Sequence, residues 1–381
     1  MNTQRLISCI AAVSSCLMAS AQQMNQQQDR SNPDLFRNLR TETRHEVIIP
    51  DVDGYKVVKT DLHVHTVYSD GDTSPEFRVK EAWRDGLDAL VISDHIEYRP
   101  SDVKFAAYLK ADKSESVDLN KSVNLARPRA EALGITLIPA TEITRSAQEV
   151  GHFNALFTTD NNLIPDPDPL QAIRNAKKQG AIVQNNHPGW ARHDAKLTST
   201  TLSAISEGLL DGMECYNDAE FYPINIEDAI NNNLYVCSGT DIHSTIAHKF
   251  GDYGQLRNMT FVLAKDSSAE SIKEALLAKR TLAYGFGDIC GRQELLEKFF
   301  LASMEFKTVS TEKNGKRSIL VTNKSSLPYY LITEDMATGI KVDGLCSVMV
   351  SLPAGKDLSF TVQNMWYGLD KHPVIKVENI Q

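Results

Sequence analysis

The chain has 381 residues, of which 42% are hydrophobic, and this is enough to build one large domain and a smaller one. A formal net charge of −9 argues against a general nucleic-acid binder, because such proteins carry a basic face that neutralises phosphates. We therefore expect no nucleic-acid partner beyond a nucleotide substrate, and an anionic substrate must be attracted by a local positive site.

The first 21 residues have the pattern of an export signal. A polar start with Arg5 precedes an apolar run over residues 6–17, and the small residues Ala19 and Ala21 predict cleavage after Ala21. The apolar run is well short of the roughly 20 residues that span a bilayer, so we expect no transmembrane segment. An alternative cleavage site of lipoprotein type ends at Cys16, and with either site the protein is exported to the periplasm or the extracellular space.

The residues that follow the signal, 22–46, are polar and rich in Gln, a composition that predicts an unstructured linker. Four cysteines lie beyond the signal, and they are too scattered in a domain of this size to form a disulfide framework. A bridge between Cys215 and Cys237 stays open, but both lie in apolar, strand-like runs, which favours buried free thiols. The other two cysteines are Cys290 and Cys346.

Residues 47–298 alternate between short β-branched runs and helical stretches. The strand-like runs include KVVKTDLHVHT, LDALVISD, ITLIPATE, HFNALFTT, AIVQNN, GMECYN, LYVCSGTD and MTFVLA. Helices are expected over residues 75–86, 120–133, 169–180, 224–233 and 269–277. Strands and helices in alternation predict an α/β fold with a parallel sheet, and seven or eight such units predict closure into a barrel.

Residues 299–381 have a different pattern. An Asn314-Gly315 turn between two strand-like runs predicts a hairpin. The later runs SVMVSLP and LSFTVQ alternate apolar and polar residues, which places Val348, Val350 and Leu352, and likewise Leu358, Phe360 and Val362, on one face. We expect a small C-terminal all-β sandwich domain.

Side chains able to bind metal ions gather where the predicted strands end. His63 and His65 are two residues apart, so on a strand they point to the same face, and Asp241 and His243 repeat this spacing at a later strand end. In an α/β barrel the ends of the strands and the loops after them carry the functional groups.

Other strand-like runs also end or begin with such residues. Burying these groups without a metal would leave several polar atoms competing for partners, at about 1 to 3 kcal/mol each. Nine ligand candidates are more than the four that one zinc-like ion accepts, so two or three ions are needed. The candidates are His63, His65, Asp70, His95, Glu142, His152, His187, Asp241 and His243.

The ordered stretches DLHVHTVYSDG, VISDH, TE, HPG and GTDIH resemble the motifs of the polymerase and histidinol phosphatase (PHP) family, over residue 58 to about residue 250. The resemblance implies a distorted (β/α)7 TIM-like barrel, the PHP fold, with a trinuclear metal site. One ion would take His63, His65, Glu142 and Asp241; a second would share Glu142 with His152 and His187; a third would take Asp70, His95 and His243. Imidazole and carboxylate ligands suit Zn, Mn and Fe.

The expected activity is hydrolysis of a phosphomonoester or phosphodiester by a hydroxide that bridges metal ions. Two or three divalent ions outweigh the three carboxylates, so the site would be positive and would attract a small phosphorylated substrate. Asp241 and Asp94 are the candidates for proton transfer. Asp94 precedes His95 and faces the other way on a strand, so it is also a candidate to orient a ligand imidazole.

Basic residues in the loops after the strands are the candidates for binding phosphate, although each is also a plausible solvated charge. They are Arg99, Arg192, His193, His248 and Lys249. Two alternatives to a phosphoesterase stay open: an amidohydrolase-type enzyme that cleaves C–N or C–O bonds, and a non-catalytic binding protein stabilised by metal. The oligomeric state is left open by the sequence.

Overall fold

The structure is a computed structural model that describes residues 43–100, 117–251, 256–333 and 339–381. Contacts divide the chain into residues 1–43 and 44–381, and the second unit is the one described below. The predicted signal (1–21) and linker residues 22–42 lie outside the described residues. At the end of the predicted linker, the Arg44 guanidinium donates to the carbonyl oxygen of Leu87 at 2.9 Å and contacts the Asp88 carboxylate at 3.1 Å.

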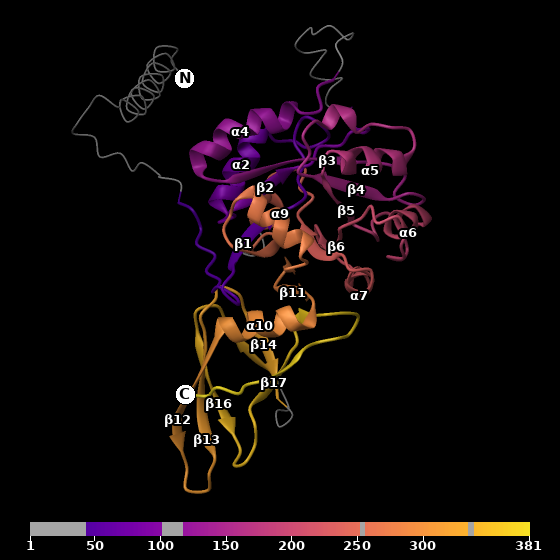
Figure 1. The fold of residues 1–381 in the computed structure, drawn as a ribbon. Helices are drawn as coiled ribbons and strands as arrows, with labels where there is room; N and C mark the ends of the chain where they lie inside the picture. The colour runs from indigo at the N-terminus through magenta and orange to yellow at the C-terminus, as the bar shows by residue number, and fades with distance from the viewer. Residues whose placement is uncertain (1–42, 101–116, 252–255, 334–338) are drawn as a thin grey trace, which may run out of the picture. The chain divides into compact units, whose positions relative to one another are not determined.

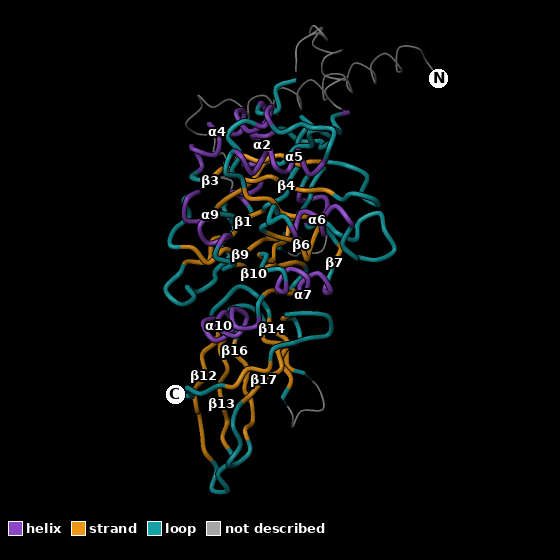
Figure 2. The backbone as a smooth tube through the Cα atoms, turned by 45° about the vertical axis from the view of Figure 1, so that its right-hand side comes forward, coloured by secondary structure: helices purple, strands orange, loops and turns teal. Residues whose placement is uncertain are grey.

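A mixed sheet forms the larger part of the second unit (Figures 1 and 2). Its strands, in the order of the sheet, are β18 (Met365–Trp366), β11 (Asp288–Gly291), β10 (Thr281–Gly285), β9 (Met259–Ala264), β1 (Lys56–Asp61), β2 (Ala89–Ile92), β3 (Thr136–Ile143), β4 (His152–Leu156), β5 (Ile182–Asn186), β6 (Gly212–Asn217) and β7 (Glu220–Phe221), with β8 (Tyr235–Gly239) paired to β6.

The prediction of an α/β fold is confirmed, but the prediction of a purely parallel sheet is wrong. The pairs β1–β2, β2–β3, β5–β6 and β6–β8 are parallel. The pairs β1–β9, β3–β4, β4–β5 and β9–β10 are antiparallel. Between β3 and β4 only residues 144–151 intervene, and so short a connection joins antiparallel neighbours because a parallel pair needs a longer crossover.

The sheet curls so that β8 lies beside β9 and β10. The Thr260 hydroxyl accepts from the backbone N–H of Ser238 at 2.9 Å and donates to the Ser238 carbonyl at 2.8 Å. The Thr281 hydroxyl likewise donates to the Val236 carbonyl at 2.7 Å. Within the described ranges β8 has no backbone ladder with β9, and side-chain hydroxyls bridge the two strands instead. The sheet is therefore a curled half-barrel, which is consistent with the distorted barrel that we expected.

Helices flank this sheet (Figure 1). Their bounds follow local signals: the Ser74 hydroxyl accepts from the N–H of Phe77 at the start of α2, and Gly134, with φ +68°, ends α4. All five predicted helices are present, with ends that differ by up to two residues. The helices are α2 (Pro75–Arg84), α4 (Lys121–Leu133), η1 (Asn161–Leu163), α5 (Pro169–Lys178), α6 (Ser199–Ser206), α7 (Pro223–Asn231), α8 (Ile246–Lys249), α9 (Ala269–Leu277) and α10 (Gln293–Ser303).

The C-terminal part has two antiparallel sheets, as predicted for an all-β region. One contains β12 (Met304–Thr311), β13 (Arg317–Asn323) and β16 (Ser347–Leu352), and the other contains β15 (Ile340–Val342), β14 (Tyr329–Ile332), β17 (Ser359–Val362) and β19 (Val374–Lys376). The predicted hairpin joins β12 to β13. Phe306 and Phe360, one from each sheet, are buried with ring centroids 6.1 Å apart, so the core lies between the sheets.

The C-terminal part is joined to the half-barrel sheet. Strand β18 pairs in parallel with β11, and the proposed boundary after residue 298 falls inside α10, whose Phe299 and Phe300 are buried in a core that both parts share. Cys215 and Cys237 are free and buried, as favoured from the sequence. In the part of the chain that the structure describes, every helix is too short or too polar to cross a membrane.

Candidate metal centre

One edge of the half-barrel collects the side chains that the sequence singled out. His63 and His65 directly follow β1, and His187 follows β5. Residue 152 begins β4, yet it lies at the same edge because β4 is antiparallel to its neighbours and pairs His152 with Asn186 at the end of β5. The antiparallel strand thus brings a strand start, rather than a strand end, to the site.

Glu142, near the end of β3, is the centre of the cluster. Its side chain is fully buried, and five imidazoles lie within 3.6 Å of its carboxylate. The distances to its nearer oxygen are 2.6 Å from His95, 3.3 Å from His152, 3.4 Å from His187, 3.5 Å from His65 and 3.6 Å from His63. The amide of Asn186 also donates to its Oε1 at 2.8 Å.

Asp241 approaches the same imidazoles from the end of β8. Its Oδ1 lies 3.0 Å from Nε2 of His65 and 3.3 Å from Nε2 of His63, and its Oδ2 lies 3.7 Å from Nε2 of His187. Asp241 has φ +49° and His187 has φ +25°, values that are unfavourable for residues with a Cβ. Strained backbone of this kind is held in place by the surrounding contacts and concentrates at functional sites.

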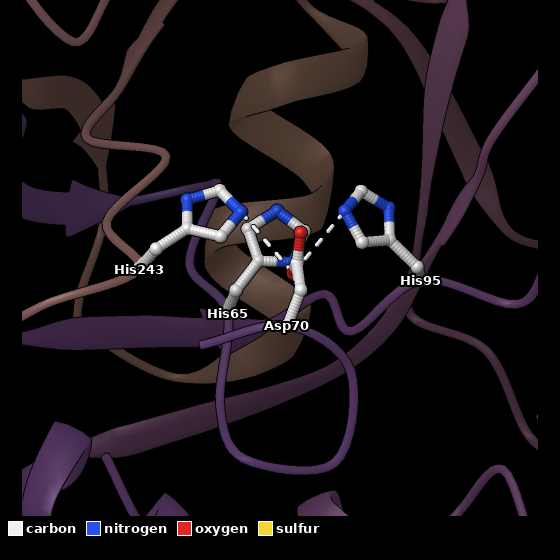
Figure 3. Close-up of side chains that lie close together, drawn as sticks. All are labelled: His65, Asp70, His95 and His243. Atoms are coloured by element: carbon white, nitrogen blue, oxygen red, sulfur yellow. Dashed lines mark ion pairs between the residues drawn. The ribbon is translucent and has the colours of Figure 1, made fainter. Parts of the chain in front are cut away.

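A second cluster surrounds Asp70, which lies between two imidazoles (Figure 3). Its Oδ1 is 3.2 Å from Nε2 of His243 and 3.4 Å from Nε2 of His95. The ring of His65 stacks against both of these rings, with centroids 4.4 and 4.3 Å away. His65 therefore connects the Asp70 cluster to the Glu142 cluster.

Three groups of these residues have ligand atoms within 4.8 Å of one another, and each group could hold a metal ion. The groups are His65, Asp70, His95 and His243; His63, His65 and Asp241; and His63, Glu142 and His187. They differ from the sets implied by the family resemblance in placing His65 with Asp70 and in placing His63 with Glu142 and His187. His152 lies outside these groups but contacts Glu142 at 3.3 Å.

The donor atoms fit the binding of metal ions. Four buried atoms of the cluster make no aligned hydrogen bond among the described residues, although each lies within 3.3 Å of an opposite group of the cluster: Asp70 Oδ1, Glu142 Oε2, Asp241 Oδ1 and His152 Nδ1. Buried polar atoms are normally hydrogen-bonded, so four of them in one place fit the binding of a ligand. Nitrogen and carboxylate oxygen donors at this density are the ligands of Zn, Mn or Fe ions.

Hydrogen bonds outside the cluster orient two of the imidazoles. The Nε2 of His152 is 2.8 Å from the Arg145 carbonyl, which leaves Nδ1 directed at Glu142. The Nδ1 of His243 is 2.8 Å from the Asp241 carbonyl, which leaves Nε2 directed at Asp70. A carbonyl can only accept, so each contacting nitrogen carries the proton and the other has a free lone pair for a metal ion.

Charge in the cluster shifts its protonation. Burial opposes the charged form of His95, but the Glu142 and Asp70 carboxylates outweigh burial and raise the pKa of His95 to about 10. Burial and the neighbouring His95 lower the pKa of His65 to about 4. Burial would raise the pKa values of Glu142 and Asp241, but the surrounding histidines hold both pKa values well below the ordinary range. The carboxylates are therefore ionised at neutral pH.

Asp94 lies beneath the cluster. Its two oxygens accept from the Thr66 N–H, the Thr66 hydroxyl and the Ser69 hydroxyl, each at 2.7 Å. Ser69 Oγ is in turn 3.3 Å from Nδ1 of His65. Asp94 thus reaches the imidazole of His65 through Ser69, in line with its interpretation as a residue that orients a ligand imidazole.

A cavity of about 440 Å³ opens over the cluster. Lys249, one of the five residues predicted to bind phosphate, lines this cavity and pairs with Asp218. His193 and His248 are exposed, and Arg192 borders a separate, smaller pocket. A guanidinium nitrogen of Arg99 donates to the backbone carbonyl of His95 at 3.1 Å.

Sequence reasoning missed several charged residues at the site, among them Asp218 and Glu220 in the cavity wall, and also Arg145 and Glu214. Arg145 lines the cavity and pairs with Glu97, and it follows β3 by two residues. Glu214 is fully buried in β6 and lies 3.0 Å from Nδ1 of His63. The signal for Glu214 was present, because it is the one charged residue in the apolar run GMECYN.

The α/β fold, with its curled half-barrel sheet and its clusters of histidine and carboxylate, defines an α/β protein with candidate metal-binding groups at one edge of the sheet. A family model for the PHP domain matches residues 61–277. The chain therefore belongs to the PHP domain family, and the expectation that the motifs raised is confirmed.

Among solved structures, a two-domain protein from Bacteroides vulgatus, described as containing a predicted PHP-like metal-dependent phosphoesterase, is 34% identical with a TM-score of 0.80. The match covers 88% of this chain and 99% of that one. Two other structures are more distant. One is an inferred metal-dependent phosphoesterase from Bifidobacterium adolescentis, with 18% identity and a TM-score of 0.39 over 59% of this chain and 97% of that chain. The other is a lesion-specific endonuclease from Pyrococcus furiosus, with 16% identity and a TM-score of 0.37 over 76% of this chain and 70% of that chain. No curated protein matches the chain.

Proposed function

We propose that this protein is an exported hydrolase that cleaves a phosphomonoester or phosphodiester with the help of two or three divalent metal ions (Zn, Mn or Fe). The observation that carries the proposal is the convergence of histidines and carboxylates into groups that could hold metal ions, with four buried donor atoms that make no aligned hydrogen bond. The similarity to a PHP-like metal-dependent phosphoesterase over nearly the whole chain supports the same class of reaction.

The ions would be held by the nine residues that the sequence singled out, with Glu142 shared between two neighbouring positions. Bound ions supply Lewis acidity toward phosphoryl oxygen and lower the pKa of water. The ligand residues are His63, His65, Asp70, His95, Glu142, His152, His187, Asp241 and His243.

The residues around the cavity would bind and orient the substrate. Arg145 and Lys249 supply positive charge to the cavity wall, each next to a carboxylate that holds it in place. Trp190 also lines the cavity, and its ring lies 5.5 Å from that of His152, so it excludes water on that side. A phosphate group between these cations and the metal cluster is held in one orientation, which lowers the entropic part of the barrier.

Of the two carboxylates considered for proton transfer, Asp241 is the better candidate. It lines the cavity, whereas both oxygens of Asp94 accept hydrogen bonds from Thr66 and Ser69 away from it. A group that moves a proton must be within hydrogen-bond reach of the reacting atoms, and of the two carboxylates Asp241 is the one that lines the cavity where a substrate would bind.

The test is a metal analysis followed by turnover assays. We expect the purified protein to contain at least two divalent ions per chain, and to hydrolyse chromogenic phosphomonoesters or phosphodiesters only when metal is present. His187→Gln should abolish turnover, while His45→Gln, at an exposed histidine outside the cluster, should not. Turnover of an amide or lactone instead of the phosphoesters, or full activity after chelation, would contradict the proposal.

A further inference from the structure

Glu214 is a fully buried carboxylate that the metal-binding groups do not include. Its Oε1 lies 3.0 Å from Nδ1 of His63, and its Oε2 accepts from the backbone N–H of His187 at 2.8 Å and from the amide of Asn217 at 2.9 Å. The carboxylate therefore connects the ends of β1, β5 and β6.

The contact between Glu214 and His63 depends on a glycine in the neighbouring strand. A Cβ atom at Gly239, in β8, would lie 2.5 Å from Oε1 of Glu214 and 2.5 Å from Cβ of His63. Real Cβ atoms do not approach other atoms so closely, so a side chain at this position would push the two residues apart. The absence of a side chain at Gly239 thus lets β8 pass close to the contact between Glu214 and His63.

Glu214 has no lysine or arginine partner among the described residues. Its hydrogen-bond partners are the His63 imidazole, a backbone N–H and the side-chain amides of Asn217 and Gln184. Burying a carboxylate whose partners are an imidazole and neutral donors costs several kcal/mol, and an apolar residue would pack at this position of β6 more favourably. A positive metal centre behind His63 would offset this cost.

We propose that Glu214 is a positioning residue for metal binding, an inference that rests on the proposed metal centre. A carboxylate only accepts, so the proton of His63 lies on Nδ1 and points to Glu214. The Nε2 of His63 then has a free lone pair directed into the cluster, where it lies 3.3 Å from Asp241 and 3.6 Å from Glu142. The bond to the His187 N–H holds that residue in its positive-φ conformation.

The structure makes this role selective. Glu214 contacts His63 and His187, which with Glu142 form one metal-binding group, and among the described residues it does not contact Asp70, His95 or His243. Loss of Glu214 should weaken metal binding at the group that contains His63 and His187, while the Asp70 group should keep its ion.

The first experiment is calorimetric titration of metal-free protein with Mn²⁺, together with elemental analysis after gel filtration. Wild type should bind two or three ions, and Glu214→Gln should bind the ion or ions that His63 helps to hold about 10 to 100 times more weakly, while the ion at the Asp70 group is bound as in wild type. The matched control is Asp211→Asn, because Asp211 also accepts a backbone N–H of β5, that of Val183, but lies at the opposite end of the strand. The control should bind metal as wild type does.

The outcomes separate the two proposals. If wild type binds no metal, the proposed function fails. If wild type binds metal and Glu214→Gln binds it with the same affinities, the role of Glu214 is refuted while the proposed function stands. If Glu214→Gln does not fold, the nitrogen chemical shifts of labelled histidines in zinc-loaded wild type decide: a protonated Nδ1 on His63 supports the inference, and a protonated Nε2 overturns it.

Discussion

Replacing Arg78 by methionine tests whether a buried arginine holds the metal-binding loops together. Arg78, in α2, is 1% exposed and pairs with Glu81 at 2.9 Å. It also donates to four backbone carbonyls, which belong to His65, Ile242, His243 and Ser244, at distances from 2.6 to 3.0 Å. Two of these are proposed metal ligands, on segments that follow β1 and β8.

The magnitude follows from what the substitution leaves behind. Arg78→Met preserves the apolar stem but leaves Glu81 buried without its cation, and breaking a buried pair in this way costs about 3 to 5 kcal/mol. The four carbonyls also lose charged donors, so we expect the free energy of unfolding to fall by about 4 kcal/mol or more. The measurement is equilibrium urea denaturation of the metal-free protein, with circular dichroism as the signal for unfolding.

The control is Arg174→Met, because Arg174 pairs with Glu207 at 2.7 Å on the surface and its side chain is 35% exposed. Exposed pairs contribute at most about 1 kcal/mol, so this variant should unfold nearly as wild type does. If Arg78→Met lost no more stability than Arg174→Met, the reasoning that buried donors hold these loops would be refuted.

Three further predictions concern pH, the sheet and the cavity. The pKa of His95 is raised to about 10 from an ordinary value near 6.5, so in metal-free protein the protonated imidazole stabilises the fold fully below about pH 6.5, and this contribution is lost as the pH rises toward 10. Added Mn²⁺ must displace that proton, so the rise in melting temperature that the metal causes should be larger at pH 9 than at pH 6. Differential scanning fluorimetry measures this rise. An equal rise at both pH values would contradict the assignment of His95 as a ligand. Thr260→Val removes the hydroxyl that bridges to both backbone groups of Ser238 and should lower the free energy of unfolding by about 1 to 3 kcal/mol, whereas Thr311→Val, on an exposed strand of the C-terminal part, should change it little in the same urea titration. Lys249→Met should lower kcat/KM for a phosphoester by about 10-fold or more if Lys249 binds the phosphate, while Lys298→Met, at an exposed ion pair far along the chain, should leave it unchanged.

Much of the candidate site could be predicted because its residues follow a simple rule of position. His63, His65, Glu142 and Asp241 occur where apolar, β-branched runs end, and strand ends of an α/β sheet meet at one edge. The same local information predicted the helices, since caps such as Ser74 and Gly134 act within a few residues. Nothing about partners distant in sequence was needed for these conclusions.

Other features could not be read from local pattern. Lys249 was one of five basic residues that the sequence supported equally as candidates for binding phosphate. The structure places Lys249 in the cavity wall together with Arg145, which the sequence analysis missed. Glu214 was missed because the role of a charged residue in a strand depends on its partner in the folded protein. Here the partner is His63, which is 151 positions away in the sequence.

The sequence by itself determined eight strands of the half-barrel sheet, five of the helices and the residues that can bind metal ions, because these depend on periodicity, caps and side-chain chemistry within a short window. It did not single out β7, β10, β11, α6, α8 or α10. Only the tertiary structure decided that β4 and β9 run antiparallel to their neighbours, that β18 from the C-terminal part joins the main sheet, and that Glu214 faces His63. The physical reason is that strand direction and pairing follow from how the whole chain closes its core, and hydrogen bonds between strands connect residues whose separation in sequence carries no periodic signal.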